Sequence, residues 1–212
     1  EPISGPTTGG TFIKIYGKGI NSMFDESELR CQFEPVIKKI YIDENGKKVE
    51  KEEKADMEPR NVPATLTKDN HTNEEEIYIE CNTPGGWPAG SRTNVKIAFD
   101  GQTYLDTGKD FYFYKIEELS PCAGPNTGEG DISFLGGGFQ DNSNVTFVMN
   151  GVSYKPLEVT EQEIRCDLPS MKNNFTGYVD IGVYLNGLDE FKYKDGFYYY
   201  SQPTIESVYP NT

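Results

Sequence analysis

The sequence predicts an all-β protein built from two antiparallel β-sandwiches in tandem, and three observations support this. The 212 residues include 22 glycines and 13 prolines, which interrupt the chain at short intervals. Between these turns, apolar residues alternate with polar ones in short runs rich in the 14 tyrosines and 12 phenylalanines, a pattern typical of strands. A Gly/Pro-rich motif near the N-terminus also recurs 119 positions later, which indicates that one kind of unit occurs twice.

Each copy opens with a Gly-Pro turn, an alternating strand and a glycine-rich corner. Residues 5–20 read GPTTGGTFIKIYGKGI, and residues 124–139 read GPNTGEGDISFLGGGF. Glycine reaches positive φ without a Cβ clash, so it suits the tight turn before each strand. The glycines after each strand, at 17–19 and 136–138, are expected to form a β-bulge that bends the chain between two sheets.

Three further segments correspond between the copies. A cysteine-bearing strand comes first, an alternating strand ending in an Asp-Gly or Asn-Gly turn follows, and an aromatic strand closes the copy. In the first copy these segments span 77–84, 95–101 and 111–114. In the second copy they span 163–169, 179–187 and 197–200. About seven strands per copy are therefore expected, as in an antiparallel sandwich.

This order of motifs resembles the IPT/TIG family of immunoglobulin-like domains. Members of that family open with Gly-Pro-x-x-Gly-Gly-Thr, a strand and Gly-x-Gly-Phe, and they continue with Cys-x-x-Pro and an aromatic strand. The first copy departs only at Ile20, which replaces the phenylalanine, and the second departs at Glu129-Gly130. The resemblance implies two tandem immunoglobulin-like (IPT/TIG) antiparallel β-sandwiches. It implies no single function, because the family serves in receptors, in transcription factors, beside carbohydrate-active catalytic domains and in large surface proteins.

The chain is expected to comprise two domains and part of a third. These are residues 1–115, residues 116–202, and residues 203–212 as the first strand of a following domain. The first domain is longer because of an insertion near 36–76. Residues 40–49 of the insertion predict a hairpin with an Asn-Gly turn, and the charged run at 48–54 predicts a solvated ribbon or loop.

Four cysteines allow three pairings. The IPT/TIG resemblance implies a disulfide between Cys31 and Cys81. In the second domain Cys166 takes the place of Cys81, but the strand at 145–149 has no cysteine to match Cys31. The remaining cysteine is Cys122, so a Cys122–Cys166 disulfide follows by elimination. The alternative is that the thiols are free and buried.

Three N-glycosylation sequons occur, at Asn70, Asn144 and Asn174. Sequons also arise by chance in a chain of this composition, so they carry weight only together with the cysteines. Paired cysteines and glycan acceptors indicate an extracellular or cell-surface glycoprotein. The chain has no run of 18 apolar residues, so no membrane insertion is expected within it.

Charge and residue types argue against several classes of function. The net charge of −14 would repel a phosphate backbone, so no nucleic-acid partner is expected. The only histidine is His71 and no Cys-x-x-Cys occurs, so the sequence lacks the ligand pattern of a zinc site and gives no sign of a Ser-His-Asp triad. We therefore expect no catalytic residues, no metal and no cofactor, in a protein that is not an enzyme.

Residues 203–212 lie beyond the closing strand of the second copy. They align with 115–121, which precede the Gly-Pro turn of the second copy, whereas no such strand precedes the first turn. We expect this segment to pack against the first domain of a following unit. The residues expected at this contact are Ile205, Val208, Tyr209 and Pro210.

Three explanations of this segment stay open. The chain belongs to a longer tandem array, separate subunits exchange the strand, or the sequence ends a short way into a third domain. The first two give a head-to-tail interaction that does not close on itself, which is how filaments form.

The function that these features favour is structural. We expect a repeat unit of an extracellular filament, stalk or surface coat, whose partner is the same chain, as a head-to-tail homopolymer or as tandem repeats. One alternative is the ectodomain of a cell-surface receptor or adhesin that binds a protein ligand. Another is an accessory carbohydrate-binding module in which Trp87 would stack on a sugar, although a packed loop residue is the competing interpretation of Trp87.

Overall fold

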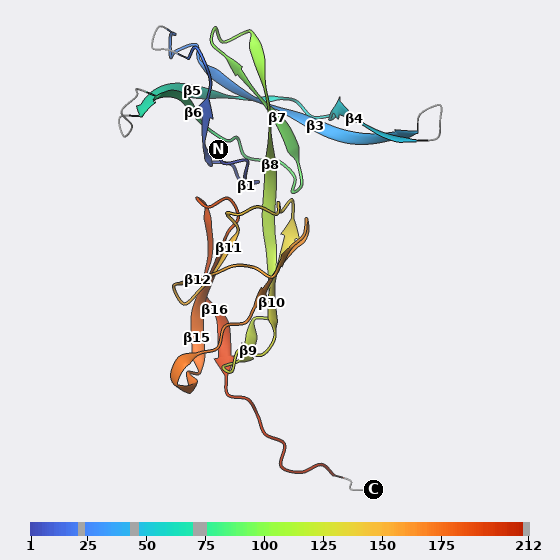
Figure 1. The fold of residues 1–212 in the computed structure, drawn as a ribbon, viewed down its shortest axis with the longest axis vertical. Helices are drawn as coiled ribbons and strands as arrows, with labels where there is room; N and C mark the ends of the chain where they lie inside the picture. Colours follow the sequence, from blue (N-terminus) through green and yellow to red (C-terminus); the bar gives the residue numbers. More distant parts are fainter. Residues whose placement is uncertain (21–23, 43–46, 70–75, 210–212) are drawn as a thin grey trace. The chain divides into compact units, whose positions relative to one another are not determined.

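The computed structural model describes residues 1–20, 24–42, 47–69 and 76–209 (Figure 1). Regular structure in these residues is almost entirely β-strand, with one short 3₁₀ helix, η1 (Lys172–Asn174). The all-β prediction is confirmed. No helix in the described ranges is both long and apolar enough to cross a membrane.

The chain divides into two compact units. Glu1–Lys115 and Gly137–Gln140 form the first unit, and Ile116–Gly136 and Asp141–Thr212 form the second. Strand β8 (Tyr104–Ser120) contributes to both units, because it begins in the first and ends in the second.

The first unit is a sandwich of two sheets. Its other strands are β1 (Ser4–Pro6), β2 (Phe12–Tyr16), β3 (Arg30–Ile42), β4 (Lys48–Lys54), β5 (Arg60–Asp69), β6 (Glu76–Asn82) and β7 (Arg92–Ala98). One sheet contains β4, β3, β7, β8 and β1, and the other contains β2 and β6. Strand β5 takes part in both, because residues 60–63 pair with β3 and residues 64–69 pair with β6.

Aromatic side chains fill the space between the sheets of the first unit. Phe33, Phe111 and Phe113 are at most 1 % exposed, and the ring centroids of Phe111 and Phe113 lie 5.1 Å apart. Trp87 stacks on Phe113 at a centroid distance of 5.4 Å. Successive side chains of a strand point to opposite faces, so one face of β8 supplies both Phe111 and Phe113 to this core.

The insertion in the first unit forms a two-stranded ribbon. Strands β3 and β4 pair antiparallel from Val36 opposite Lys54 to Ile42 opposite Lys48, and Figure 1 shows this ribbon extending from the sheet. The charged run at 48–54 is thus a strand. The Asn-Gly turn expected at 45–46 lies outside the described residues.

The second unit is also a sandwich of two sheets. Its strands are β9 (Ala123–Pro125), β10 (Asp131–Gly137), β11 (Thr146–Met149), β12 (Val152–Tyr154), β13 (Glu158–Val159), β14 (Glu163–Asp167), β15 (Gly177–Tyr184) and β16 (Glu190–Tyr200). One sheet has the order β13-β14-β10-β8, and the other has β12-β11-β15-β16-β9. Phe134 and Phe147, one from each sheet, are fully buried, with ring centroids 6.0 Å apart.

The two units repeat the same strand pairing in the same register. In both, a short N-terminal strand pairs parallel with the closing aromatic strand. The antiparallel pairings β2–β6 and β7–β8 of the first unit recur as β10–β14 and β15–β16 in the second. In the first unit the matched pairs are Ser4–Tyr112, Ile13–Cys81 and Thr93–Phe111. In the second unit they are, in the same order, Ala123–Tyr198, Ile132–Cys166 and Val179–Phe197. This agreement follows the sequence repeat position by position.

A glycine is required at the same point of each opening turn. A Cβ atom on Gly5 would lie 2.9 Å from Cζ of Phe111, and one on Gly124 would lie 3.0 Å from Cζ of Phe197. In each unit an aromatic ring of the closing strand therefore packs directly on the backbone of the Gly-Pro turn. This close approach explains why the motif contains glycine there.

Candidate interaction surface

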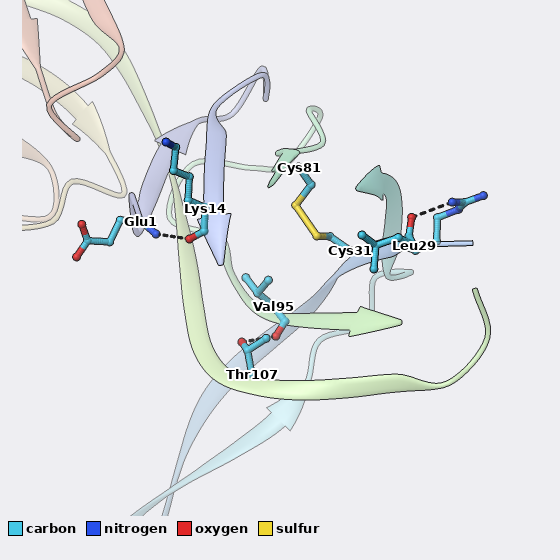
Figure 2. The surroundings of a disulfide bond; sticks show 8 residues. Glu1, Lys14, Leu29, Cys31, Cys81, Val95 and Thr107 are labelled. Atoms are coloured by element: carbon cyan, nitrogen blue, oxygen red, sulfur yellow. Dashed lines mark hydrogen bonds between the residues drawn. A yellow bond between two sulfur atoms is a disulfide. The ribbon is translucent and has the colours of Figure 1, made fainter. Parts of the chain in front are cut away.

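A disulfide links the two sheets of the first unit. Cys31 in β3 and Cys81 in β6 are bonded, with their Cα atoms 6.7 Å apart (Figure 2). Both residues are buried in the aromatic core. The pairing that the family resemblance implies is therefore present.

The expected Cys122–Cys166 disulfide is wrong. Both cysteines are free: Cys122 is exposed before β9, whereas Cys166 is fully buried in β14. Burial raises the pKa of the Cys166 thiol to about 12, because the core disfavours the thiolate. The thiol therefore behaves as a small apolar core side chain.

Register confirms that no cysteine takes the place of Cys31 in the second unit. In the first unit Cys31 lies opposite Ile97 of β7. The matching pair in the second unit is Phe147 opposite Val183 of β15. A buried phenylalanine thus occupies the place of Cys31, and Cys166 packs in the core without a partner cysteine.

Two of the three sequons can be placed on the surface. Asn144 is exposed in the turn before β11, and Asn174 is exposed at the end of η1. Asn70 lies outside the described residues. The two placed side chains are accessible to modification, and their glycosylation stays a prediction.

Trp87 is a core residue and not a sugar-stacking platform. Its side chain is 3 % exposed, with Phe113 on one side and the Arg60 guanidinium 4.5 Å from the ring centroid. Arg60 also donates to the backbone carbonyl of Gly86 at 3.2 Å, which helps to hold this loop. The carbohydrate-binding alternative thus loses the residue on which it was based.

Exposed tyrosines form a surface on the second unit, defined by Tyr178 in β15 and Tyr198 and Tyr200 in β16. Tyr178 lies directly opposite Tyr198, with ring centroids 4.9 Å apart, and is 64 % exposed. Tyr198 and Tyr200 are each 38 % exposed, whereas Phe197 and Tyr199, which alternate with them along the strand, are buried. We call these three residues the tyrosine surface. The sequence indicates an aromatic strand here, but it does not show that alternation divides the strand between core and solvent.

The corresponding positions of the first unit have different chemistry. Arg92 takes the place of Tyr178, and Tyr112 that of Tyr198. The Arg92 guanidinium lies 6.0 Å from the Tyr112 ring centroid, and its Nε donates to Asp110 at 2.9 Å. An arginine that pairs with Asp110 therefore takes the place of the exposed Tyr178 ring, so the tyrosine surface belongs to the second unit.

The segment after β16 has no strand in the described residues. Ile205, Val208 and Tyr209 are 85 %, 65 % and 85 % exposed, and Figure 1 shows the segment leaving β16 as an extended chain. Pro210, the fourth residue expected at the inter-unit contact, lies outside the described residues. Whether these residues contact another copy stays a prediction.

The described ranges contain no group of three or more His, Cys, Asp or Glu side chains placed to hold a metal ion. His71 lies outside these ranges.

The fold defines the chain as a pair of immunoglobulin-like β-sandwiches. Residues 115–200, less than half of the chain, match the model of the IPT/TIG domain. No curated protein matches the sequence.

Similar solved structures include two of the full extracellular region of plexin A4. The structure of domains 1 to 8 is 16 % identical with a TM-score of 0.40, covering 94 % of this chain and 17 % of that chain. The structure of domains 1 to 10 is 17 % identical with a TM-score of 0.45, and the match covers 99 % of this chain and 16 % of that chain. This chain thus spans less than a fifth of their length, and likenesses this remote do not bear on function.

Proposed function

We propose that the chain is a non-enzymatic part of the ectodomain of a cell-surface receptor or adhesin, and that it binds a protein ligand through the tyrosine surface. The observation that carries this proposal is the exposure of three tyrosines on adjacent strands of one sheet. Tyrosine is enriched in protein interfaces because it combines a large apolar ring with a polar hydroxyl. Clustered exposed aromatic side chains on a soluble domain mark interaction sites.

The proposal includes a second copy of the IPT/TIG domain in residues 1–115. The family model covers only 115–200, but the strand register of the first unit agrees with that of the second at each matched pair. The shared glycine under the closing aromatic ring is further support. The insertion that forms β4 and lengthens β3 separates the motifs that the first unit shares with the second, which would weaken a match by a family model.

The extracellular location rests on the disulfide and the accessible sequons. Disulfides persist in oxidising compartments and are rare in the cytosol. The Cys31–Cys81 bond is buried between two sheets, as expected of a structural disulfide. Asn144 and Asn174 are exposed on the second unit, where glycan could be attached.

Removing two rings of the tyrosine surface is expected to abolish most ligand binding. The probe is a fluorescent tetramer of the chain, applied to living cells of the organism that encodes it. For Tyr178→Ala with Tyr198→Ala we expect the apparent affinity to fall at least ~10-fold, because a central interface tyrosine contributes on the order of 2 kcal/mol. The matched control is Leu105→Ala with Leu157→Ala, which removes exposed apolar side chains elsewhere.

Binding that is lost in the tyrosine variant and kept in the control supports the proposal. Binding of equal strength in both variants would show that the tyrosine surface is not the recognition site. Absence of cell binding by the unmodified tetramer would contradict the receptor or adhesin function itself.

A second candidate function is the repeat unit of a stalk, filament or surface coat. The observation that favours it is the extended segment at 203–209, whose Ile205 and Val208 are exposed in the single chain. Apolar residues in an extended segment are suited to pair with a sheet edge of another domain.

A further inference from the structure

The outer face of the β11-β15-β16 sheet has a hollow near the tyrosine surface. In β15 the side chains of Val179 and Ile181 are buried, so Tyr178, Asp180 and Gly182 lie on the outer face. A hollow of about 320 Å³ is lined by Gly182 and by residues of all three strands. We call it the Gly182 hollow. The missing side chain of this glycine leaves a recess in the face that carries the tyrosines.

The corresponding position in the first unit is a lysine. Lys96 lies opposite Gln32 of β3, and Gly182 lies opposite Val148 of β11. Gln32 and Val148 each come one residue after the positions matched above through Cys31, so Lys96 and Gly182 are equivalent. The fold therefore places a lysine on this face in one unit and only a backbone in the other.

Lys96 shows what this position of the fold can hold. Its ammonium group forms an ion pair with Glu34, which is only 6 % exposed. Lysine lays its apolar stem along the surface and places its charge at the tip, here against a carboxylate. A cationic side chain therefore fits over this part of the sheet where a carboxylate lies beside it.

Two carboxylates line the Gly182 hollow. An oxygen of Glu190 would lie 3.2 Å from a Cβ atom on Gly182, so this carboxylate reaches the space over the glycine. Asp180 accepts from Lys192 at 2.9 Å and from the Asp195 N–H at 3.0 Å, and its side chain is 37 % exposed. A carboxylate has about four lone-pair sites, so Asp180 can accept a further hydrogen bond from a cation in the hollow.

The charge of the second unit favours a basic ligand over an acidic one. Residues 116–212 contain 14 acidic and five basic side chains. Such a surface attracts a basic segment and repels a second copy of this chain. Tyrosine rings also hold cations over their faces. In the first unit Arg92 lies over Tyr112, the residue that corresponds to Tyr198 of the tyrosine surface.

We propose that the Gly182 hollow receives a lysine or arginine side chain from a basic, extended segment of the protein ligand, and that the same segment crosses the tyrosine surface. This inference rests on the proposed function and names the chemistry of its ligand. Tyr178 and Gly182 are four residues apart on one strand, about 13 Å at 3.3 Å per residue. An extended segment with basic residues four positions apart therefore spans both places.

Nuclear magnetic resonance with a defined peptide tests the inference. The probe is acetyl-Gly-Arg-Gly-Ser-Gly-Arg-Gly-amide, added to the isotope-labelled chain at low ionic strength, where charges are least screened. We expect saturable shifts in the backbone amide signals of Gly182 and of its neighbours on β11 and β16. The same peptide with citrulline in place of both arginines is neutral and similar in shape. It should bind at least ~10-fold more weakly, because it lacks the charge-assisted hydrogen bonds.

Neutral variants of the two carboxylates identify the site. Asp180→Asn with Glu190→Gln changes charge with little change of shape, and the first substitution copies Asn94 of the first unit. We expect this variant to bind the arginine peptide at least ~10-fold more weakly. The matched control is Asp131→Asn with Glu158→Gln, which removes two exposed carboxylates from the other sheet and should leave the affinity unchanged. The amide spectrum of each variant reports its folding.

Equal affinity for the arginine and citrulline peptides, or shifts that do not include Gly182, would overturn the inference without reliance on any variant. The tetramer assay on cells separates it from the proposed function. If the tyrosine variant loses cell binding while Asp180→Asn with Glu190→Gln keeps it, the basic ligand is wrong and the proposed function stands. If the tyrosine variant keeps cell binding, the proposed function fails, and the peptide titration alone decides whether the hollow binds cations.

Discussion

Phe113→Ala is expected to lower the free energy of unfolding of the first unit by about 3–5 kcal/mol, the range for truncating a buried phenylalanine. Phe113 is fully buried, and its ring contacts those of Phe111, Phe33 and Trp87 at centroid distances of 5.1, 6.4 and 5.4 Å. Removing it leaves a cavity at the centre of this cluster. Because small domains are stable by only about 5–15 kcal/mol, a large part of the first unit's stability would be lost.

Urea unfolding followed by tryptophan fluorescence measures this effect. Trp87 is the only tryptophan and packs on Phe113, so its emission reports the first unit alone. The matched control is Phe12→Ala, because Phe12 is in the same unit but 54 % exposed. Its effect should stay within about 1 kcal/mol. Equal shifts for the two variants would mean that Phe113 is not at the centre of the core.

Removing the disulfide is the second large effect. For Cys31→Ala with Cys81→Ala we expect the first unit to lose about 2–5 kcal/mol of unfolding free energy, as is usual for native disulfides of small secreted domains. The bond joins residues 50 positions apart and ties β3 to β6, which belong to different sheets that share only strand β5. Its loss releases a long loop in the unfolded chain and removes a buried link in the folded one.

The control for the disulfide is a free cysteine. Cys122→Ser changes an exposed thiol that has no disulfide partner, so the free energy of unfolding should change by less than about 0.5 kcal/mol. Reductant should lower the midpoint reported by Trp87 in the unmodified chain and leave it unchanged in the double alanine variant. A double variant as stable as the unmodified chain would contradict the structural role of the bond.

The sequence repeat predicted the fold because its motifs carry strong local constraints. Gly5 and Gly124 are required by rings that pack on them, and the alternating strands after them place Ile13 and Ile132 in the two cores. Such constraints act within a few residues, or between strands joined by a short turn. They are visible in one sequence without any knowledge of the fold.

Features that depend on distant pairing were predicted poorly. The sequence showed that the strand at 145–149 has no cysteine, but not that Cys122 is exposed before β9 while Cys166 is buried in β14, because both placements depend on the assembled sheets. Strand β5 joins both sheets at residues 63–64, a change of partner that has no local signal. The tyrosine surface follows from which face of β16 is inward, and alternation alone did not decide this because Phe197–Tyr200 is aromatic throughout.

The central claim is that this chain is an extracellular module, with one disulfide in the first unit and none in the second. Peptide mapping of the chain secreted from eukaryotic cells, alkylated before unfolding and never reduced, tests it most directly. The account predicts a Cys31–Cys81 cross-link, alkylated Cys122, unmodified Cys166 and glycan on Asn144 or Asn174. Alkylated thiols at both Cys31 and Cys81, together with bare asparagines at every sequon, would contradict it.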